Sequence, residues 1–209
     1  MKHTLVFAML AGALAVTACQ QGPSNRTIGT TAGGAIVGAG LGTLAGGDDK
    51  RNAAIGAVVG GLAGAAVGVY MDEQERKLRE ATQGTGIQVA RNGDQIALNM
   101  PSSITFDFDS ATIKPGFYTP LNDVAATLID YPQTAVDIVG HASADGPDDY
   151  NMRLSQQRAE SVQNYLVSQG MRSVRLQAVG MGETQPTGLG YEADRRVEII
   201  LTPIVDENA

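Results

Sequence analysis

Apolar and polar positions in the second half of the chain repeat with two periods, one typical of strands and one typical of helices. Over residues 87–100 they alternate on either side of Asn92-Gly93, which predicts a β-hairpin. Further strands are predicted for residues 104–109, 135–140, 175–179 and 197–201, and helices for residues 114–130 and 149–169. Strands that alternate with helices predict an α+β domain, an α/β sandwich with helices packed on the sheet.

Glycine recurs at every fourth position in the first third of the chain. The two runs are Gly34, Gly38, Gly42 and Gly46, and, after a polar break, Gly56, Gly60, Gly64 and Gly68. On a helix this spacing forms a bare stripe along which two helices can touch backbone to backbone. Each glycine costs about 0.5–1 kcal/mol relative to alanine in a helix, so close packing must offset that cost. We therefore expect a glycine-zipper helical hairpin over residues 28–70.

Three environments for this zipper remain open. Each half is about 18 residues, or about 27 Å of helix, which is close to the hydrocarbon thickness of a bilayer. Small residues also pack helices closely in lipid, so the hairpin can insert into a membrane. A zipper that joins two copies of the chain outside lipid fits the pattern equally well. A flexible glycine/alanine linker is the third interpretation, which the strict register disfavours.

A short charged helix is expected to follow the zipper. Over residues 70–82, Glu73 with Lys77 and Glu75 with Arg79 form i, i+4 pairs on a solvated face. The expected segments are residues 71–83 for this connecting helix, 84–102 for the β-hairpin, 103–203 for the main folded domain and 204–209 for a tail.

The N-terminus has the features of a cleaved targeting sequence. Lys2 precedes an apolar run over residues 4–16, which is too short to span a membrane as a mature helix. Small residues then precede Cys19. These features predict a lipoprotein signal peptide over residues 1–18.

The four residues Val-Thr-Ala-Cys that end at Cys19 resemble a bacterial lipobox. The resemblance implies that Cys19 is acylated and that residues 19–27 form a lipidated tether. Because the chain has one cysteine, an intramolecular disulfide is excluded. Gln20 follows the cysteine, which by the sorting rule of enteric lipoproteins implies passage to the outer membrane.

The acidic composition argues against a nucleic-acid partner, and the spacing of the candidate catalytic residues argues against catalysis. Residues 84–209 carry 8 Lys and Arg against 16 Asp and Glu, whereas binding to phosphate backbones needs a basic footprint. His141, Ser143 and Asp145 lie within five residues, but catalytic triads draw their members from separate elements. The other histidine, His3, lies in the signal peptide, so we expect no metal site and no cofactor.

A strand, a polar loop and a helix follow one another within residues 137–160. This junction places His141, Ser143 and Asp145 beside the N-terminus of a helix. Backbone N–H groups and the helix dipole favour an anionic ligand at such a place. Arg158, about two turns into the helix, can reach back over the loop.

Three blocks of sequence then recur in a known order. Gly140-His141, Asn151-x-x-Leu154-Ser155-x-x-Arg158-Ala159 and Asp194-Arg195-Arg196-Val197-Glu198 resemble the OmpA C-terminal domain, a family that binds peptidoglycan. The order of lipobox, glycine zipper and this domain resembles YiaD-type lipoproteins. The resemblance implies a mixed sheet with helices on one face, without enzymatic activity.

In that family a groove binds the diaminopimelate of the peptidoglycan stem peptide. The resemblance implies that the ligand-binding positions of the family correspond here to Asp107, Asn151, Leu154, Arg158 and Arg195. A guanidinium can give a ligand carboxylate two parallel N–H donors, where lysine cannot. Asp107 and Asn151 are expected to hold the ligand amine or to order the loop. The alternative for Arg158 is a structural ion pair, for example with Asp145.

Three features depart from the family pattern. Ser143 stands where the family has an acid that binds the ligand ammonium. Unless another group substitutes for that acid, the binding free energy should fall by on the order of 1–2 kcal/mol, or about tenfold in affinity. Asp145 is the candidate substitute, although an extended loop would place it about 6–7 Å further along. Asp194 replaces an asparagine and adds negative charge near a carboxylate ligand. Tyr191 lies in a loop that is shorter than usual.

These features together predict a non-enzymatic outer-membrane lipoprotein whose domain faces the periplasm, binds peptidoglycan non-covalently and tethers the envelope to the cell wall. Its expected partners are peptidoglycan and the membrane, with self-association through the zipper left open. The alternative is an envelope interaction or assembly protein. In that case Ser143 has weakened or altered peptidoglycan recognition, and the zipper drives membrane insertion or oligomerisation.

Overall fold

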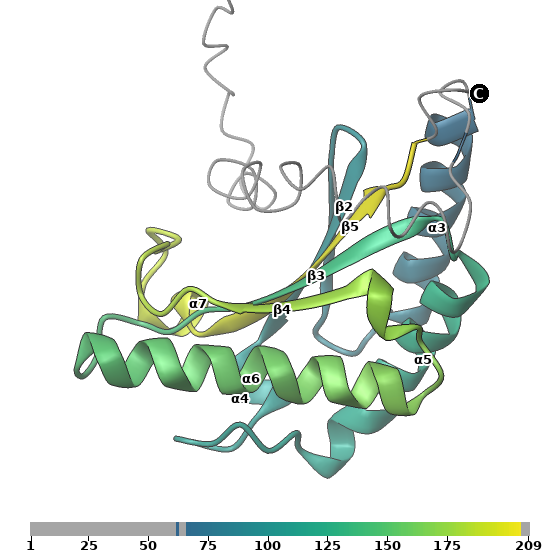
Figure 1. The fold of residues 1–209 in the computed structure, drawn as a ribbon. Coiled ribbons are helices and arrows are strands. Elements are labelled where there is room, and N and C mark those ends of the chain that lie inside the picture. The colour runs from purple at the N-terminus through teal and green to yellow at the C-terminus, as the bar shows by residue number, and fades with distance from the viewer. Residues whose placement is uncertain (1–61, 63–65, 206–209) are drawn as a thin grey trace, which may run out of the picture. The chain divides into compact units, whose positions relative to one another are not determined.

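A computed structural model describes Leu62 and residues 66–205 of the chain. The predictions for the signal peptide, Cys19, the tether and most of the zipper therefore lie outside the described residues. The described part is built on one five-stranded sheet with the strand order β1-β2-β5-β3-β4 (Figure 1). The strands are β1 (Gln88–Asn92), β2 (Gln95–Pro101), β3 (Thr134–Gly140), β4 (Leu176–Gly180) and β5 (Arg196–Pro203). β3 and β4 are parallel and the other pairs are antiparallel, so the predicted mixed sheet is confirmed.

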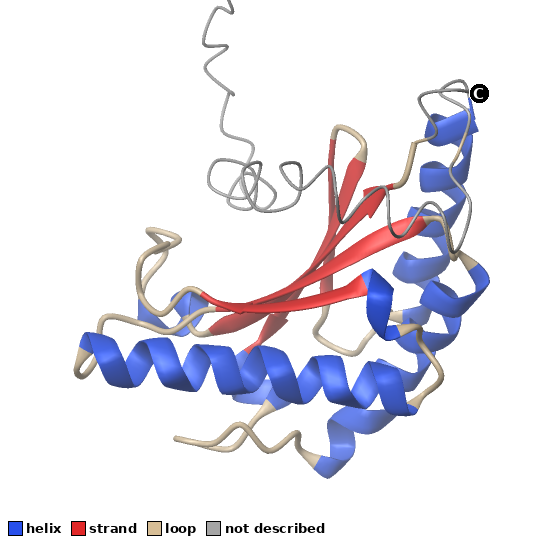
Figure 2. Ribbon diagram, in the orientation of Figure 1, coloured by secondary structure: helices blue, strands red, loops and turns tan. Residues whose placement is uncertain are grey.

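Three long helices cover one face of this sheet (Figure 2). They are α3 (Val67–Ala81), α5 (Tyr118–Asp130) and α6 (Asp148–Ser168). Shorter turns of helix are α4 (Ser102–Thr105), η2 (Pro115–Phe117), η3 (Ser173–Arg175) and α7 (Tyr191–Asp194). Alternate strand residues such as Leu98, Ile138 and Ile199 enter the core between the sheet and these helices. Between residues 66 and 205, none of the helices combines the length and the apolarity that crossing a bilayer requires.

The β-hairpin predicted for residues 87–100 is present as β1 and β2. Asn92 pairs with Gln95, which leaves Gly93 and Asp94 as a two-residue turn, and Gly93 has a φ of 57°. Positive φ is the conformation that glycine adopts without steric cost, so this turn explains why the hairpin could be predicted.

Helix α3 belongs to the domain core, although its sequence suggested only a charged connecting helix. Met71, Gln74 and Leu78 are buried on its inner side. On its outer side Arg79 pairs with Glu75 as predicted. Glu73 contacts Arg76 directly, and the charge of Lys77, its predicted partner, makes a smaller contribution to lowering the pKa of Glu73.

Leu62 and Ala66 are the described residues of the second glycine run before α3, and Leu62 contacts the end of the sheet. Its backbone N–H donates to the carbonyl of Ile204 at 2.7 Å, and it forms an isolated parallel β-bridge with Val205. This contact differs from the helix that the glycine register predicts at this position. The chain therefore enters the domain at the end of β5.

The strand predicted for residues 104–109 was wrong. The region forms α4 followed by a loop, with a single β-bridge between Phe106 and Ile113. Its apolar alternation does not mark one buried face, since Phe106 is 2% exposed whereas Phe108 is 99% exposed. The preceding strand, β2, already pairs with β1 on one side and β5 on the other. A strand over residues 104–109 therefore could not pair with β2.

Candidate functional site

The N-terminal half of α6 lies unusually close to the ends of β3 and β4. A Cβ atom on Gly140 would lie 2.0 Å from the carbonyl oxygen of Ser155, and one on Gly180 would lie 2.5 Å from the backbone nitrogen of Gln156. The Oγ of Ser155 accepts a hydrogen bond of 2.9 Å from the N–H of Gly182. These contacts fix the first turns of α6 beside the loop that follows β3.

That loop brings Ser143, Asp145 and Arg195 together. The Ser143 hydroxyl donates to Asp145 Oδ2 at 3.3 Å, and Arg195 Nη1 donates to Ser143 Oγ and to Asp145 Oδ2, both at 3.2 Å. The loop is bent, so Asp145 returns to Ser143 instead of lying further along an extended chain. Ser143 is 3% exposed, whereas the Asp145 side chain is 56% exposed and open to a ligand.

Asn151 joins this cluster to a residue that sequence reasoning missed. Its Nδ2 donates to the carbonyl of Ser143 at 3.0 Å and to Glu183 Oε2 at 2.7 Å. Asn151 is buried and orders the loop, one of the two roles expected for it. Leu154 lies half-buried one turn further along α6. Nothing in the sequence singled out Glu183, which the fold brings to Asn151 from the loop after β4.

Arg158 is buried at the centre of the same helix. It is 4% exposed, its Nε donates to the carbonyl of Ser110 at 2.9 Å, and its guanidinium carbon lies 5.2 Å from the centre of the Phe106 ring. Burial lowers the pKa of Arg158, and the nearby positive charge of Arg195 lowers it further. Asp145 contacts Arg195 and not Arg158, so the ion pair considered for Arg158 does not form. Among the described residues, only the Nε of this guanidinium has a hydrogen-bond partner.

In the described part of the chain, no hydrogen bond or ion pair joins Asp107 to the other predicted site residues. Its side chain is 72% exposed and faces Lys114 at 3.9 Å. Asp109, two residues on, is the carboxylate at the site: it accepts a hydrogen bond from the Tyr150 hydroxyl, and its charge stabilises the protonated form of Arg158. The Phe-Asp-Phe-Asp repeat of the sequence contains both acids and does not distinguish them.

Asp194 does not face the site. Its Oδ1 accepts hydrogen bonds from the backbone N–H of Thr187 at 2.6 Å and from the Thr187 hydroxyl at 2.7 Å. This carboxylate therefore holds the loop before α7 in place. Its negative charge is already engaged by two donors, which answers the concern that it would repel an anionic ligand.

Comparison with known proteins places the chain among its relatives. The OmpA family model matches residues 105–198, and the YMGG-like Gly-zipper model matches residues 1–72. The chain is 45% identical over 215 residues to "Probable lipoprotein YiaD" of Escherichia coli (strain K12), with 96% of this chain and 97% of that protein covered. The chain belongs to the OmpA family. The glycine zipper and the OmpA-like domain recognised in the sequence are thereby confirmed.

Two further comparisons concern the OmpA-like domain alone. The "Peptidoglycan-associated lipoprotein" of Mesorhizobium japonicum is 32% identical over 106 residues, which are 51% of this chain and 63% of that protein. The solved structure of the cell wall anchor of the T6SS from Pseudomonas aeruginosa superposes with a TM-score of 0.56 at 24% identity, over 62% of this chain and 96% of that one. This similarity shows that the fold is shared.

Beside the site, the OmpA-like domain contains a buried charged group made by His141, Arg196 and Glu198. Arg196 Nε donates to Glu198 Oε1 at 2.6 Å, whereas His141 Nε2 is 4.0 Å from Glu198 Oε2, too far for a hydrogen bond. Burial and the charge of Arg196 lower the pKa of His141 to about 3. Burial raises the pKa of Glu198 although Arg196 opposes this. His141 is therefore a neutral core residue; moreover, residues 66–205 contain no cluster of acids, histidines or cysteines that could hold a metal.

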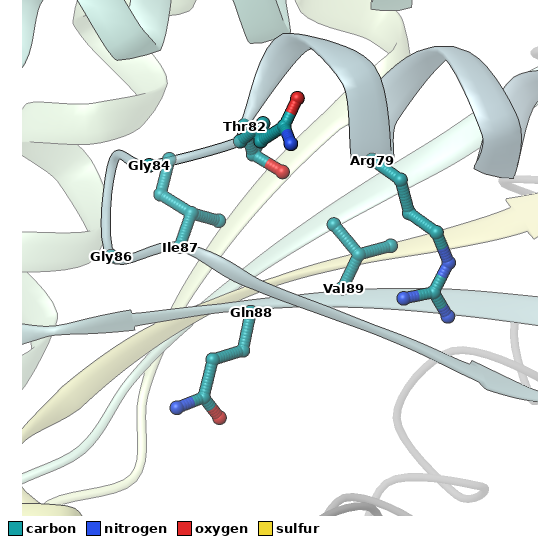
Figure 3. A pocket seen from close by; sticks show the side chains of 8 residues that line it. Arg79, Thr82, Gly84, Gly86, Ile87, Gln88 and Val89 are labelled. Carbon is teal, nitrogen blue, oxygen red and sulfur yellow. The ribbon is translucent and has the colours of Figure 1, made fainter.

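The OmpA-like domain also has an open pocket at the junction of α3 and β1 (Figure 3). Two of its polar side chains are engaged within the protein, since Arg79 contacts Glu75 and the Thr82 hydroxyl donates to the carbonyl of Leu78. It lacks the convergent charges found at the start of α6. We therefore place the candidate site at Arg158, Arg195 and the surrounding loop residues.

Proposed function

We propose that this chain is a non-enzymatic outer-membrane lipoprotein whose OmpA-like domain binds the diaminopimelate of the peptidoglycan stem peptide and tethers the envelope to the cell wall. The observation that carries the proposal is the gathering of two guanidinium groups, Arg158 and Arg195, with two carboxylates, Asp109 and Asp145, around the start of α6. The far end of diaminopimelate carries one carboxylate and one ammonium group. Such a zwitterion needs groups of both signs.

Arg158 is the proposed partner of the ligand carboxylate. Its guanidinium is largely removed from water and lies against Phe106, so a charge-assisted hydrogen bond to it is stronger than one made at the surface. Arg195 lies near enough to disfavour the charged form of Arg158. An anion that binds near both guanidinium groups relieves this repulsion.

Asp145 is the proposed partner of the ligand ammonium. It takes the place of the acid that the family has at the position of Ser143. Its carboxylate is partly exposed and lies against the Ser143 hydroxyl. Asp109 provides a second carboxylate on the Arg158 side of the site. Similarity to the peptidoglycan-associated lipoprotein of Mesorhizobium japonicum supports the same ligand class. Acylation of Cys19 would hold the other end of the chain in the outer membrane, with the domain in the periplasm.

Co-sedimentation with purified sacculi that contain diaminopimelate tests this proposal. The protein is the mature full-length chain with Cys19→Ser, which removes the acyl anchor. We expect the parent protein to pellet with sacculi, Arg158→Ala to remain in the supernatant, and Arg158→Lys to bind at least tenfold more weakly because it lacks the planar fork. Arg153→Ala, an exposed arginine on the same helix, is the matched control and should bind normally.

Free diaminopimelate should compete with the sacculi for the parent protein. If the parent protein stays in the supernatant, or if Arg158→Ala pellets as well as Arg153→Ala, the domain is not a peptidoglycan anchor of this kind. The interaction or assembly role would then be the better account of the chain.

A further inference from the structure

The β4 edge of the sheet is closed by side chains from α6. The N–H of Met181, just after β4, donates to a carbonyl of β3, so the odd-numbered residues of β4 bond to β3 and the even-numbered ones face outward. Gln163 Nε2 donates to the outward carbonyl of Leu176 at 3.2 Å. Gln156 Oε1 accepts a hydrogen bond of 2.5 Å from the outward N–H of Gly180. Glutamine side chains therefore occupy positions that another strand would need.

The other edge strand, β1, is open. Its two-residue turn makes Asn92 and Gln95 a hydrogen-bonded pair, and Ala90 bonds to β2 in the same way. The backbone N–H and C=O groups of Val89 and Arg91 therefore face outward. In the described part of the chain no hydrogen bond reaches these groups. The open pocket at the junction of α3 and β1 borders Val89, so there is space beside the strand (Figure 3).

An unpaired edge is a template for one more strand. We propose that β1 of one copy of the chain pairs antiparallel with β1 of a second copy, about a two-fold axis at Ala90. The pairing joins two five-stranded sheets into one continuous sheet. Because the β4 edge is closed, the assembly ends at two copies, whereas two open edges would allow an endless stack.

The outward backbone groups and the charges select this register. With Ala90 opposite the second copy's Ala90, Val89 lies opposite Arg91, and each such pair exchanges both of its backbone hydrogen bonds. A register centred on Arg91 places like charges opposite each other. A register centred on Val89 needs the N–H of Ile87, which already donates to Thr85 Oγ1 at 3.3 Å. The register at Ala90 avoids both costs.

The pocket beside β1 also fits a second copy. In the same register the turn of the second copy brings Asp94 level with Gly86, which lines the pocket together with Arg79 (Figure 3). The Asp94 side chain is 74% exposed. Arg79, although it contacts Glu75, keeps a side chain that is 53% exposed. The two-fold axis brings this acid and this guanidinium together twice, and opposite charges of this kind favour one orientation of the partner.

Cysteine cross-linking tests the pairing in the mature full-length chain with Cys19→Ser, which has no other thiol. Ala90→Cys places the two thiols on either side of the axis. Residues opposite each other in a non-hydrogen-bonded pair have Cα atoms about 4.5 Å apart, which is within disulfide range. Under mild oxidation we expect Ala90→Cys to form a disulfide-linked dimer at least tenfold faster than Gln177→Cys. The control, Gln177, is exposed on the closed edge strand β4.

Two further positions test the register. Gln88 of one copy lies opposite Asn92 of the other, whereas two copies of either residue are about 14 Å apart along the strands. A mixture of Gln88→Cys and Asn92→Cys should therefore cross-link at least tenfold faster than either variant alone. Both residues are exposed, so the substitutions leave the core of the domain unchanged.

Three results would overturn the proposal. Equal rates for Ala90→Cys and Gln177→Cys would show that β1 does not pair with a second copy. Self-cross-linking of Asn92→Cys as fast as its cross-linking to Gln88→Cys would show that the copies meet in another way, for example through the zipper. Protection of Ala90→Cys from a maleimide without cross-linking would show that a different segment occupies the edge.

Discussion

Asp145 lies two residues beyond Ser143, yet the bend of the loop brings its Oδ2 within 3.3 Å of the serine hydroxyl. An acid two residues away therefore reaches the position where the family has an acid and this chain has Ser143. Sequence spacing placed Asp145 several ångströms too far away, because spacing assumes an extended chain. The bend depends on Asn151, which holds the Ser143 carbonyl from α6.

Replacement of Asp145 by asparagine tests whether this acid serves the ligand. Asp145→Asn should lower affinity for sacculi about tenfold, since the ligand ammonium loses a charged acceptor. Addition of Ser143→Asp to that variant should restore binding, because it returns the acid to the family position. A binding isotherm measured by co-sedimentation gives both values, and Asp149→Asn at the start of α6 is the control. Unchanged binding by Asp145→Asn would show that Asp109 alone serves the ammonium.

His141 should make the stability of the fold depend on pH. Its folded pKa is about 3, whereas an unfolded histidine titrates near 6.5. Between these values the unfolded chain binds more protons than the folded chain, so the free energy of unfolding falls as pH falls below about 6.5. The raised pKa of Glu198 acts in the opposite direction at pH values above its ordinary pKa of 4.5, and this contribution is common to the parent and to a variant without the histidine.

We therefore expect the parent protein to lose about 2 kcal/mol of stability relative to His141→Gln between pH 7.5 and pH 5.0. Urea denaturation of both proteins at the two pH values measures this difference. Gln157→Asn, an exposed change on α6, should follow the parent protein. Parallel pH profiles for the parent and His141→Gln would show that the histidine titrates normally in the fold.

Which of the two acids near Phe106 lies at the candidate site could not be predicted from the sequence. Asp107 and Asp109 stand in nearly the same local sequence, but Asp109 has a φ of 55° and turns toward Tyr150, whereas Asp107 faces Lys114. Aspartate tolerates this left-handed conformation better than most residues do. Only the folded position of Tyr150 in α6 distinguishes the two acids.

Among the elements, the hairpin and the long helices could be predicted because their patterns are local. The false strand at residues 104–109 had the same kind of pattern but lacked a partner, and pairing is a property of the whole sheet. α3 was underestimated for a related reason. Its buried side consists of Met71, Gln74 and Leu78, and most of its other residues are charged or polar. The packing of α3 against α5 was therefore not visible in the sequence.

Gly140 shows how tightly α6 is seated on the sheet. Gly140→Ala would place a methyl group 2.0 Å from the Ser155 carbonyl oxygen, and that backbone atom cannot move without shifting the helix. Overpacking of this kind should cost about 1–3 kcal/mol of stability. Chemical denaturation measures the loss, and Gly116→Ala is the matched control because open space surrounds that position. Equal stabilities would mean that α6 is free to shift, and the site it positions would then be loosely held.

For the whole molecule, the chain combines a zipper and an OmpA-like domain, and its two ends have different expected partners. The order of these parts was readable from the sequence because each has its own composition. What the sequence could not show is that the domain begins before the charged helix, with Leu62 at the end of β5 and α3 in the core. Leu62, which belongs to the second glycine run, therefore already contacts the folded domain.

If the acylated Cys19 and the Arg158 site are separate attachments, each should hold the protein without the other. In fractionated cells, Cys19→Ala should leave the membrane fraction but stay with sacculi, and Arg158→Ala should leave sacculi but stay with the membrane. The double variant should become soluble, unless the zipper itself inserts into lipid, in which case carbonate washing would not release it. Each single variant should nevertheless stay with the envelope, because the attachment that is left still holds the chain. Complete release by Cys19→Ala alone would contradict the sacculus site, and complete release by Arg158→Ala alone would contradict the lipid anchor.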